Sequence, residues 1–264
     1  MKKEKYFFNN RNEKKRLEIK FDSEEAKQQL LDMGFKKGMI FLDAGCGTGA
    51  MVRTVRKYDP KNKHIYGIDA NKEFLTYASS RTSSNRSNYC GSNIYKLPFK
   101  NNSFDFIWTR FVLEHLVNPL AAIKEMKRVL KTDGILAVGD LDGNCVFHYP
   151  MDPAFEKNLD TILKLLSPYG FDPFIGRKLF SFLKILKFAK INVQLYPYHN
   201  IFGRPKKNDW MNWNIKINST IGFLKKNTKL SGDDLKNLKK QLLSFILNKN
   251  TYTYSMLIFA KGVK

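Results

Sequence analysis

The chain has 264 residues, the length of one large domain or two small ones. With 43% hydrophobic and 27% charged residues, its composition excludes a wholly disordered chain. No apolar run approaches the ~18–20 residues of a membrane-spanning helix, and the basic start lacks the apolar stretch of a signal peptide. The 3 cysteines are too scattered for a disulfide framework or a zinc site. We therefore expect a soluble cytoplasmic protein without a structural metal.

The charge is unusual, because 46 basic and 24 acidic residues give a formal net charge of +22. Residues 1–20 carry 8 basic and 3 acidic side chains, and residues 204–264 carry 13 and 3. Such a balance suits a nucleic acid or an anionic membrane surface as partner. It also suits a merely biased composition, since 36 of the 46 basic residues are lysines and phosphate recognition usually uses more arginine.

Strands alternate with helices along the first half of the chain. Residues 39–43 form a short apolar run bounded by Gly38, which is typical of a buried parallel strand. Residues 12–33 show helical spacing, and Gly34 is a typical helix end. This alternation predicts a parallel sheet covered by helices on both faces. The further expected elements are helices over 50–58, 72–81 and 118–130, and strands over 64–69, 87–90, 104–109 and 135–140.

The second half is less regular. We interpret the Lys- and Asn-rich stretch 204–250 as an insertion between the last two strands. Trp210 and Trp213 lie in it, and they fit a lid over a flat apolar ligand, a stacking surface for nucleic acid, or the buried faces of two helices. The expected elements are helices over 154–166 and 177–188, a strand over 191–202, two helices within 204–250, and a strand over 252–260.

Three glycines and two acids mark a ligand site. Gly45, Gly47 and Gly49 follow the first expected strand, so their backbone can pass close to a ligand at the strand ends. Asp69 lies 20 residues after Gly49, where a carboxylate can accept both hydroxyls of an adenosine ribose. A nicotinamide dinucleotide and S-adenosylmethionine both fit this pattern. Asp43 favours the second, because a carboxylate there repels a pyrophosphate but attracts an ammonium and a sulfonium.

Four motifs follow one another in the chain: Leu-Asp-Ala-Gly-Cys-Gly-Thr-Gly at 42–49, Gly-Ile-Asp-Ala-Asn at 67–71, Leu-Pro-Phe with Ser-Phe-Asp at 97–105, and Arg-Val-Leu-Lys-x-x-Gly at 128–134. Together they resemble the class I S-adenosylmethionine-dependent methyltransferases. The likeness is strongest to the branch that methylates small molecules, including quinone-pathway and natural-product enzymes, and covers about residues 14–200. It implies a doubly wound, Rossmann-like α/β sheet of seven strands whose last strand, here 252–260, is antiparallel.

The resemblance also implies roles for single residues. The glycine loop would flank the methionine and ribose portions of the cofactor, Asp69 would hold the ribose, and Arg110 would lie beside the methionine end. Such enzymes usually have an Asp near the adenine where this chain has Ser92 and Asn93. These side chains can still accept that hydrogen bond without the charge, so we expect weaker but retained cofactor binding. The expected cofactor-binding residues are Asp43, Gly45, Cys46, Gly47, Gly49, Asp69, Ala70, Asn71, Ser92, Asn93, Arg110 and Phe111.

His115 and Asp140 are the candidate catalytic residues on the acceptor side. His115 would be a general base, or a histidine that packs the loop after the fourth strand. Asp140 and Asp142 are expected just after the fifth strand, where they could orient an amine, take up a proton or remain solvated. Arg177 could pair with an acidic group of the acceptor or cap a helix.

We therefore expect a methyltransferase that uses S-adenosylmethionine to methylate oxygen, nitrogen or carbon of a small molecule, with no metal. An RNA or protein methyltransferase that uses the basic C-terminal segment is one alternative. A non-catalytic, cofactor-binding interaction subunit is another. The expected organisation is a helical segment over the cofactor site at 1–33, the core at 34–203, a basic aromatic lid at 204–250 and the last core strand at 251–264.

Overall fold

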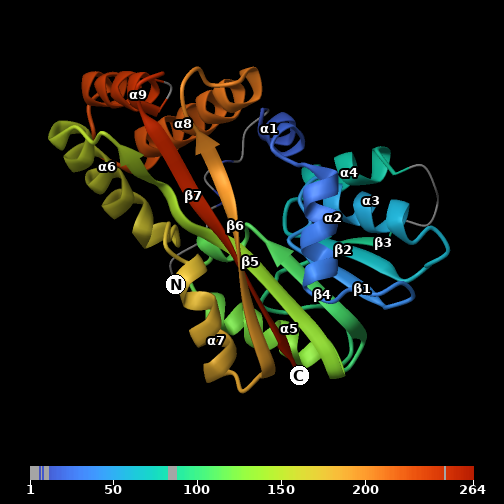
Figure 1. Cartoon of the computed structure of the whole chain (residues 1–264). Coiled ribbons are helices and arrows are strands. Elements are labelled where there is room, and N and C mark those ends of the chain that lie inside the picture. Colours follow the sequence, from blue (N-terminus) through green and yellow to red (C-terminus); the bar gives the residue numbers. More distant parts are fainter. Residues whose placement is uncertain (1–5, 7, 9–11, 83–87, 247) are drawn as a thin grey trace.

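The computed structural model describes residues 6, 8, 12–82, 88–246 and 248–264. Its strands form a 7-stranded sheet in the order β3-β2-β1-β4-β5-β7-β6 (Figure 1). Strands β1 to β5 pair in parallel, whereas β7 runs antiparallel to β5 and β6. The predicted architecture with an antiparallel last strand is thereby confirmed. The strands are β1 (Phe41–Ala44), β2 (Ile65–Asp69), β3 (Asn88–Gly91), β4 (Phe104–Arg110), β5 (Leu130–Tyr149), β6 (Ala189–Ile201) and β7 (Tyr252–Val263).

Helices cover both faces of the sheet. In β1, Phe41 shares a buried cluster with α2 and α3, whereas the next residue, Leu42, belongs to a cluster with α5 and α7. Because both faces are buried, Phe41 and Leu42 are both apolar, and the strand does not alternate apolar with polar residues as a half-exposed strand does. The helices are α1 (Glu13–Ile19), α2 (Ser23–Asp32), α3 (Ala50–Tyr58), α4 (Lys72–Ser80), α5 (Pro119–Val129), α6 (Pro153–Leu166), α7 (Leu179–Ile185), α8 (Lys207–Asn227) and α9 (Gly232–Ile246), with single 3₁₀ turns at η1 (Leu113–His115), η2 (Ser167–Tyr169) and η3 (Gly176–Lys178).

The stretch 12–33 forms two helices, α1 and α2, so the expectation of one continuous helix is wrong. Asp22 causes the break, because its backbone is extended (φ −98°, ψ 118°) and its side chain accepts hydrogen bonds from the N–H groups of Glu24 and Glu25 at 2.9 and 3.0 Å. An aspartate N-cap of this kind starts a new helix. Residues 1–5, 7 and 9–11 of the expected N-terminal segment, and residue 87 of the expected strand 87–90, lie outside the described residues.

Strand β5 is far longer than the expected strand 135–140. It pairs with β4 as far as Gly139, whereas its pairing with β7 on the other side runs from Ile135 to Tyr149. Because its later partner comes from the end of the chain, the local pattern does not reveal the extension. The longer strand changes the environment of the acids that were expected in a loop after it.

Helices α6, α8 and α9 form a group beyond the end of the long strands (Figure 1). They share an apolar cluster that contains Phe155 of α6, Trp213 of α8 and Leu242 of α9. Helices α8 and α9 lie between β6 and β7, as expected of the two helices within 204–250. Trp213 is buried, whereas Trp210 is 51% exposed, so only Trp213 is a core residue.

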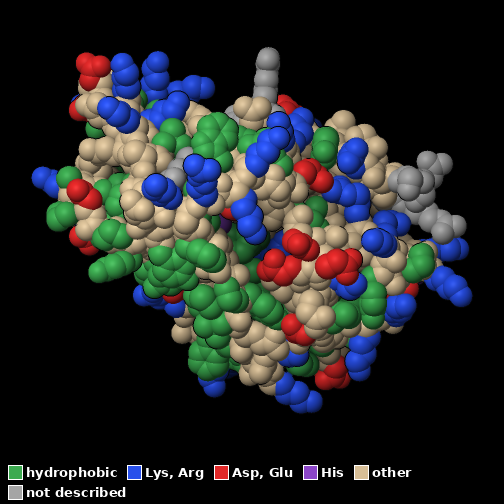
Figure 2. All heavy atoms as spheres, turned by 45° about the horizontal axis from the view of Figure 1, so that its top comes forward, with side chains coloured by type: hydrophobic (Ala, Val, Ile, Leu, Met, Phe, Trp, Pro, Cys, Tyr) green, Lys and Arg blue, Asp and Glu red, His purple; other side chains and the backbone are tan. Residues whose placement is uncertain are grey.

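Lysine and arginine side chains are spread over the face shown in Figure 2, and they are dense over α8 and α9 at its upper left. Among the residues described, no helix combines the length and apolar character needed to cross a membrane. The same part of the chain has no group of 3 or more His, Cys, Asp or Glu side chains that could hold a metal ion.

Candidate functional site

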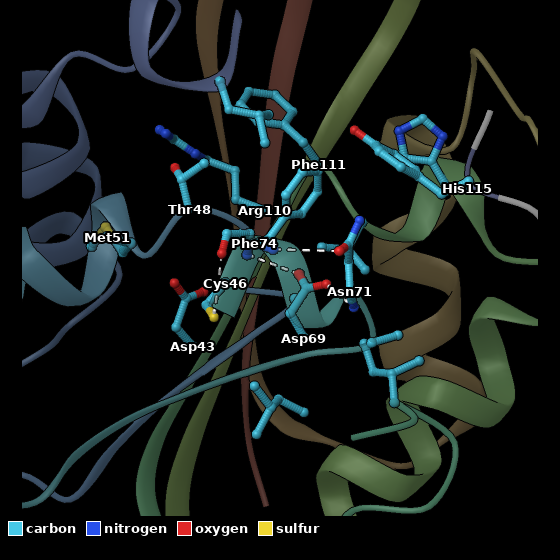
Figure 3. A pocket seen from close by; sticks show the side chains of 18 of the residues that line it. Asp43, Cys46, Thr48, Met51, Asp69, Asn71, Phe74, Arg110, Phe111 and His115 are labelled. Atoms are coloured by element: carbon cyan, nitrogen blue, oxygen red, sulfur yellow. Dashed lines mark hydrogen bonds between the residues drawn. The ribbon is translucent and has the colours of Figure 1, made fainter. Parts of the chain in front are cut away.

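A cavity of about 650 Å³ lies at the carboxyl ends of β1, β2 and β4 (Figure 3). Open α/β sheets bind their ligands in this crevice. Of the described residues expected at the site, Gly49 and Asp140 lie outside its wall. The expected residues that line it are Asp43, Gly45, Cys46, Gly47, Asp69, Ala70, Asn71, Ser92, Asn93, Arg110, Phe111 and His115.

Glycine is required at two points of the loop between β1 and α3. Gly45 has φ +85°, and a Cβ there would lie 3.1 Å from Cγ1 of Val112 and closer still to Cγ2. Gly49, the N-cap of α3, has φ +75°, and a Cβ there would lie 2.8 Å from Cβ of Ala78. Both positions combine left-handed backbone with close packing. Gly45 thus shapes the cavity wall, and Gly49 closes the turn behind it.

Asp69 organises the backbone at the end of β2. Its Oδ2 accepts a hydrogen bond from the N–H of Gly47 at 2.8 Å, and its Oδ1 accepts one from the N–H of Asn71 at 2.8 Å. Burial raises the pKa of Asp69 against the effect of these bonds. The side-chain oxygen of Asn71 caps α4 by accepting from the N–H groups of Glu73 and Phe74. Asp69 therefore ties the glycine loop to the start of α4, and its remaining lone pairs are available to the cavity.

Asp43 projects from β1 into the same part of the cavity and is only 4% exposed (Figure 3). Burial raises its pKa to about 7, while the nearby Arg110 opposes the rise and Asp69 adds to it. A buried carboxylate with a raised pKa in a cavity is typical of a binding site. A cationic group of a ligand would restore its charged form.

Arg110 and Phe111 form another part of the wall. The guanidinium of Arg110 donates a hydrogen bond to Oε1 of Gln29 at 2.9 Å and lies 5.1 Å from the ring centroid of Phe21 and 4.9 Å from that of Phe111. Phe111 has φ +61°, and its N–H donates to the carbonyl of Gly139 at 3.0 Å. A bulky residue rarely adopts this conformation, and such strain concentrates at functional sites.

Ser92 and Asn93 follow β3 and line the far end of the cavity. The N–H of Ser92 donates to the carbonyl of Asp69 at 3.0 Å, and its hydroxyl donates to the carbonyl of Lys96 at 3.4 Å. The side-chain oxygen of Asn93 accepts from the N–H of Tyr95 at 2.9 Å. This part of the wall therefore offers neutral polar atoms to a ligand.

His115 lines the cavity from η1. The rings of Tyr6, Phe8 and Phe171 lie around it, with centroids 5.0, 5.6 and 6.0 Å from that of the imidazole. Its Nε2 lies 3.4 Å from Oε1 of Glu114. The imidazole is thus held among aromatic rings with a carboxylate at one nitrogen.

Glu114 connects His115 to α8. Its Oε2 accepts a hydrogen bond from Nδ2 of Asn144 at 2.5 Å, and Oδ1 of Asn144 accepts one from Nζ of Lys216 at 2.5 Å. Burial acts to raise the pKa of Glu114, but His115, Lys216 and Asn144 together lower it to about 2. The charged Glu114 therefore places a carboxylate beside Nε2 of His115. Sequence reasoning missed this chain of contacts, because it joins three separate elements.

The expected loop position of Asp140 is wrong. Asp140 lies inside β5, is fully buried and has its carboxylate bound to the N–H groups of Glu114 and Leu141 at 3.1 and 2.9 Å. Burial and the nearby Glu114 raise its pKa. Asp140 therefore supports the turn that begins η1. Asp142, also in β5, forms an ion pair with Arg177 at 2.6 Å.

The N-terminal segment covers the cavity with residues that the sequence did not single out. Leu17 of α1 packs on the glycine loop, where a Cβ on Gly47 would lie 3.5 Å from its Cδ1. Glu13 is fully buried and accepts hydrogen bonds from Nε and Nη2 of Arg16 at 2.8 and 2.7 Å and from the hydroxyl of Tyr6 at 2.7 Å. Helical spacing signals that this segment is a helix, but not which residues face a ligand. The residues of this segment that line the cavity without having been predicted from the sequence are Tyr6, Arg16, Leu17, Lys20 and Phe21.

Residues 42–138 match the family model of a methyltransferase domain. A putative methyltransferase from Bacillus halodurans is similar in structure, with a TM-score of 0.60 at 14% identity over 91% of this chain and 99% of that one. The phosphoethanolamine N-methyltransferase 2 of Haemonchus contortus has a TM-score of 0.57 at 17% identity over 91% and 52%. The family model thus matches residues 42–138 as a methyltransferase domain, and the fold of the chain is similar to the folds of these two solved proteins.

Curated relatives share part of the chain. An uncharacterized methyltransferase of Schizosaccharomyces pombe is 30% identical over 167 residues, which are 60% of this chain and 59% of the relative. A demethylmenaquinone methyltransferase of Staphylococcus aureus strain MRSA252 is 35% identical over 143 residues, which are 54% and 57%. The chain thus spans less than two thirds of the length of these relatives.

Proposed function

We propose that this protein is an S-adenosylmethionine-dependent methyltransferase that acts on a small molecule. The observation that carries the proposal is the cavity at the strand ends, in which Asp43, Asp69 and the glycine loop lie together beneath α1. Asp69 would bind the ribose hydroxyls, and Asp43 would bind the ammonium of the methionine portion. The cofactor supplies an electrophilic methyl group when it is bound.

The other expected residues fit the two ends of such a ligand. Ala70, Asn71, Ser92 and Asn93 lie where the adenine would follow the ribose, and Arg110 with Phe111 would bound the methionine end. The fit does not depend on a carboxylate at the adenine end, because a neutral oxygen also accepts a hydrogen bond.

The protein's own part in methyl transfer is to position the acceptor and exclude water, because the reaction is an in-line displacement. His115 would take a proton from an acceptor hydroxyl or carbon acid. Glu114 beside Nε2 would stabilise the imidazolium that this step creates. Asp140 would act only indirectly, by holding the N–H of Glu114.

Methyl-labelled S-adenosylmethionine, incubated with the purified protein and an extract of its own cells, tests the proposal. We expect label in the small-molecule fraction and none when the protein is omitted. Label in RNA or protein would contradict the small-molecule proposal and favour a role in substrate binding for the basic segment 204–264. Tight cofactor binding without any labelled product would favour the non-catalytic alternative.

Gly45→Ala is expected to weaken the binding of S-adenosylhomocysteine by about 10-fold or more, because the methyl group would push Val112 and the loop into the cavity. Left-handed strain should also lower the free energy of unfolding by about 1–3 kcal/mol. Titration calorimetry and urea unfolding measure the two effects.

Gly38→Ala is the matched control, because Gly38 has φ +86° but nothing within 4 Å of its added Cβ. It should lose stability to a similar extent and keep the affinity for S-adenosylhomocysteine within about 2-fold. Equal affinities for Gly45→Ala and the wild type would contradict the placement of the cofactor at this loop.

A further inference from the structure

We propose that the acceptor carries a carboxylate or phosphate group and that Lys20 binds it. The inference rests on the proposed function and adds the chemical class of the acceptor. Its starting point is the part of the cavity wall where Arg16, Lys20 and Arg110 lie; the fourth basic side chain of the wall, Lys72 at the start of α4, is exposed. Asp43 and Asp69 are the acids of the wall.

Arg16 and Arg110 are already engaged by other side chains. Arg16 makes two hydrogen bonds to Glu13, at 2.8 and 2.7 Å, so its charge is neutralised within α1. Arg110 donates to Gln29, and it also experiences the charge of Asp43. In a mostly buried wall, these contacts fix both guanidinium groups in place.

Lys20 is different. Its Nζ lies 4.3 Å from the ring centroid of Phe111 and, within the described residues, has no hydrogen-bonding or ion-pairing partner. Burial, together with the charges of Arg16 and Lys216, lowers the pKa of Lys20 to about 7 against the opposing effect of Glu13 and Glu114. A lysine ammonium in this position favours an anion beside it, because a buried cation without a counter-charge is costly.

The charges of the proposed cofactor leave Lys20 unneutralised. The ammonium of the cofactor would contact Asp43, and the carboxylate of the cofactor would face Arg110. Asp69 already accepts two backbone hydrogen bonds and would also accept hydrogen bonds from the ribose. The sulfonium would add a positive charge to the one on Lys20. An anionic group on the acceptor would balance this excess positive charge, and its attraction to Lys20 would hold the acceptor beside the ring of Phe111.

Lys20→Met is the test variant and Lys15→Met its matched control, since Lys15 is exposed on the same helix. Calorimetry measures the binding of benzoate, phenyl phosphate and the neutral isostere benzamide, with and without saturating S-adenosylhomocysteine. Benzoate and phenyl phosphate distinguish a carboxylate from a phosphate acceptor. Lys20 is the C-cap of α1 and has right-handed helical backbone angles, which methionine and arginine also adopt. Thermal unfolding checks that each variant is folded.

We expect the wild type to bind at least one of the two anions and to bind benzamide at least about 10-fold more weakly. Lys20→Met should weaken that anion by about 10- to 100-fold, Lys20→Arg should keep most of the affinity, and Lys15→Met should change it by less than about 2-fold. The affinity for S-adenosylhomocysteine should stay within about 3-fold in all variants.

Three results of the titrations with benzoate, phenyl phosphate and benzamide would overturn the inference: no anion binding below about 10 mM, equal binding of benzamide, or anion binding that survives in Lys20→Met. A loss of S-adenosylhomocysteine binding in Lys20→Met would also overturn it, because Lys20 would then hold the cofactor. Failure of the wild type to bind S-adenosylhomocysteine would instead contradict the proposed function. The anion titrations in the absence of S-adenosylhomocysteine would then still decide whether Lys20 binds an anion.

Discussion

Asp43→Asn is expected to stabilise the ligand-free protein at pH 8 and, at the same pH, to weaken S-adenosylhomocysteine binding by about 10- to 100-fold. Asp43 is 4% exposed, and burial raises its pKa from 3.8 to about 7. The folded protein therefore holds the proton more tightly than the unfolded chain does. At pH 8 the folded protein must therefore bury a charged carboxylate at a cost in stability. Asparagine removes this cost, but it also removes the charge that would bind the ammonium of the ligand.

The pH dependence follows from the direction of this shift. The contribution of Asp43 to stability is fully present below about pH 4, falls as the pH rises towards 7, and is lost above the folded pKa. Above pH 7 the variant should exceed the wild type by on the order of 2–4 kcal/mol in free energy of unfolding. Urea unfolding at pH 5, 6, 7 and 8 measures the difference.

Asp160→Asn is the control, because the side chain of Asp160 is 62% exposed. It should change neither the pH dependence nor the affinity for S-adenosylhomocysteine. If Asp43→Asn binds the ligand as the wild type does, Asp43 is not the partner of the ammonium. If its stability follows the same pH curve as the wild type, the carboxyl of Asp43 is not strongly shifted.

Arg16→Met should lower the free energy of unfolding at pH 7 by about 3–5 kcal/mol. The reason is Glu13, which is fully buried and would lose both hydrogen bonds from the guanidinium. Only the hydroxyl of Tyr6 and its weaker hydrogen bond would remain at this carboxylate. The effect is large because removing one partner leaves an uncompensated charge in a medium of low polarity. Urea unfolding followed by circular dichroism measures it.

The double variant Glu13→Leu/Arg16→Met should recover much of this loss, because an apolar pair replaces the buried ion pair without leaving a charge. Lys164→Met is the surface control, since Lys164 and its partner Asp160 are both exposed, and it should cost less than about 1 kcal/mol. A single Arg16→Met variant as stable as the surface control would mean that Glu13 finds another partner or takes up a proton.

The sequence by itself determined the alternation of strands and helices and the glycine loop with its two acids. These features depend on neighbours in the chain. The strand at Phe41–Ala44 is buried on both faces, and the left-handed backbone at Gly45 and Gly49 needs glycine whatever surrounds it. Asp69 lies at a strand end, and parallel strands bring their carboxyl ends to the same edge of the sheet.

Only the tertiary structure decided what covers that edge and which side chains meet there. Asp140 changed from an expected loop acid to a fully buried group because β7, from the far end of the chain, pairs with β5 beyond Gly139. Lys20 faces the cavity because Asp22 breaks the N-terminal helix and α1 docks over the glycine loop. Such contacts join segments that are distant in sequence, and their geometry depends on how helices and strands pack rather than on the local periodicity of either segment.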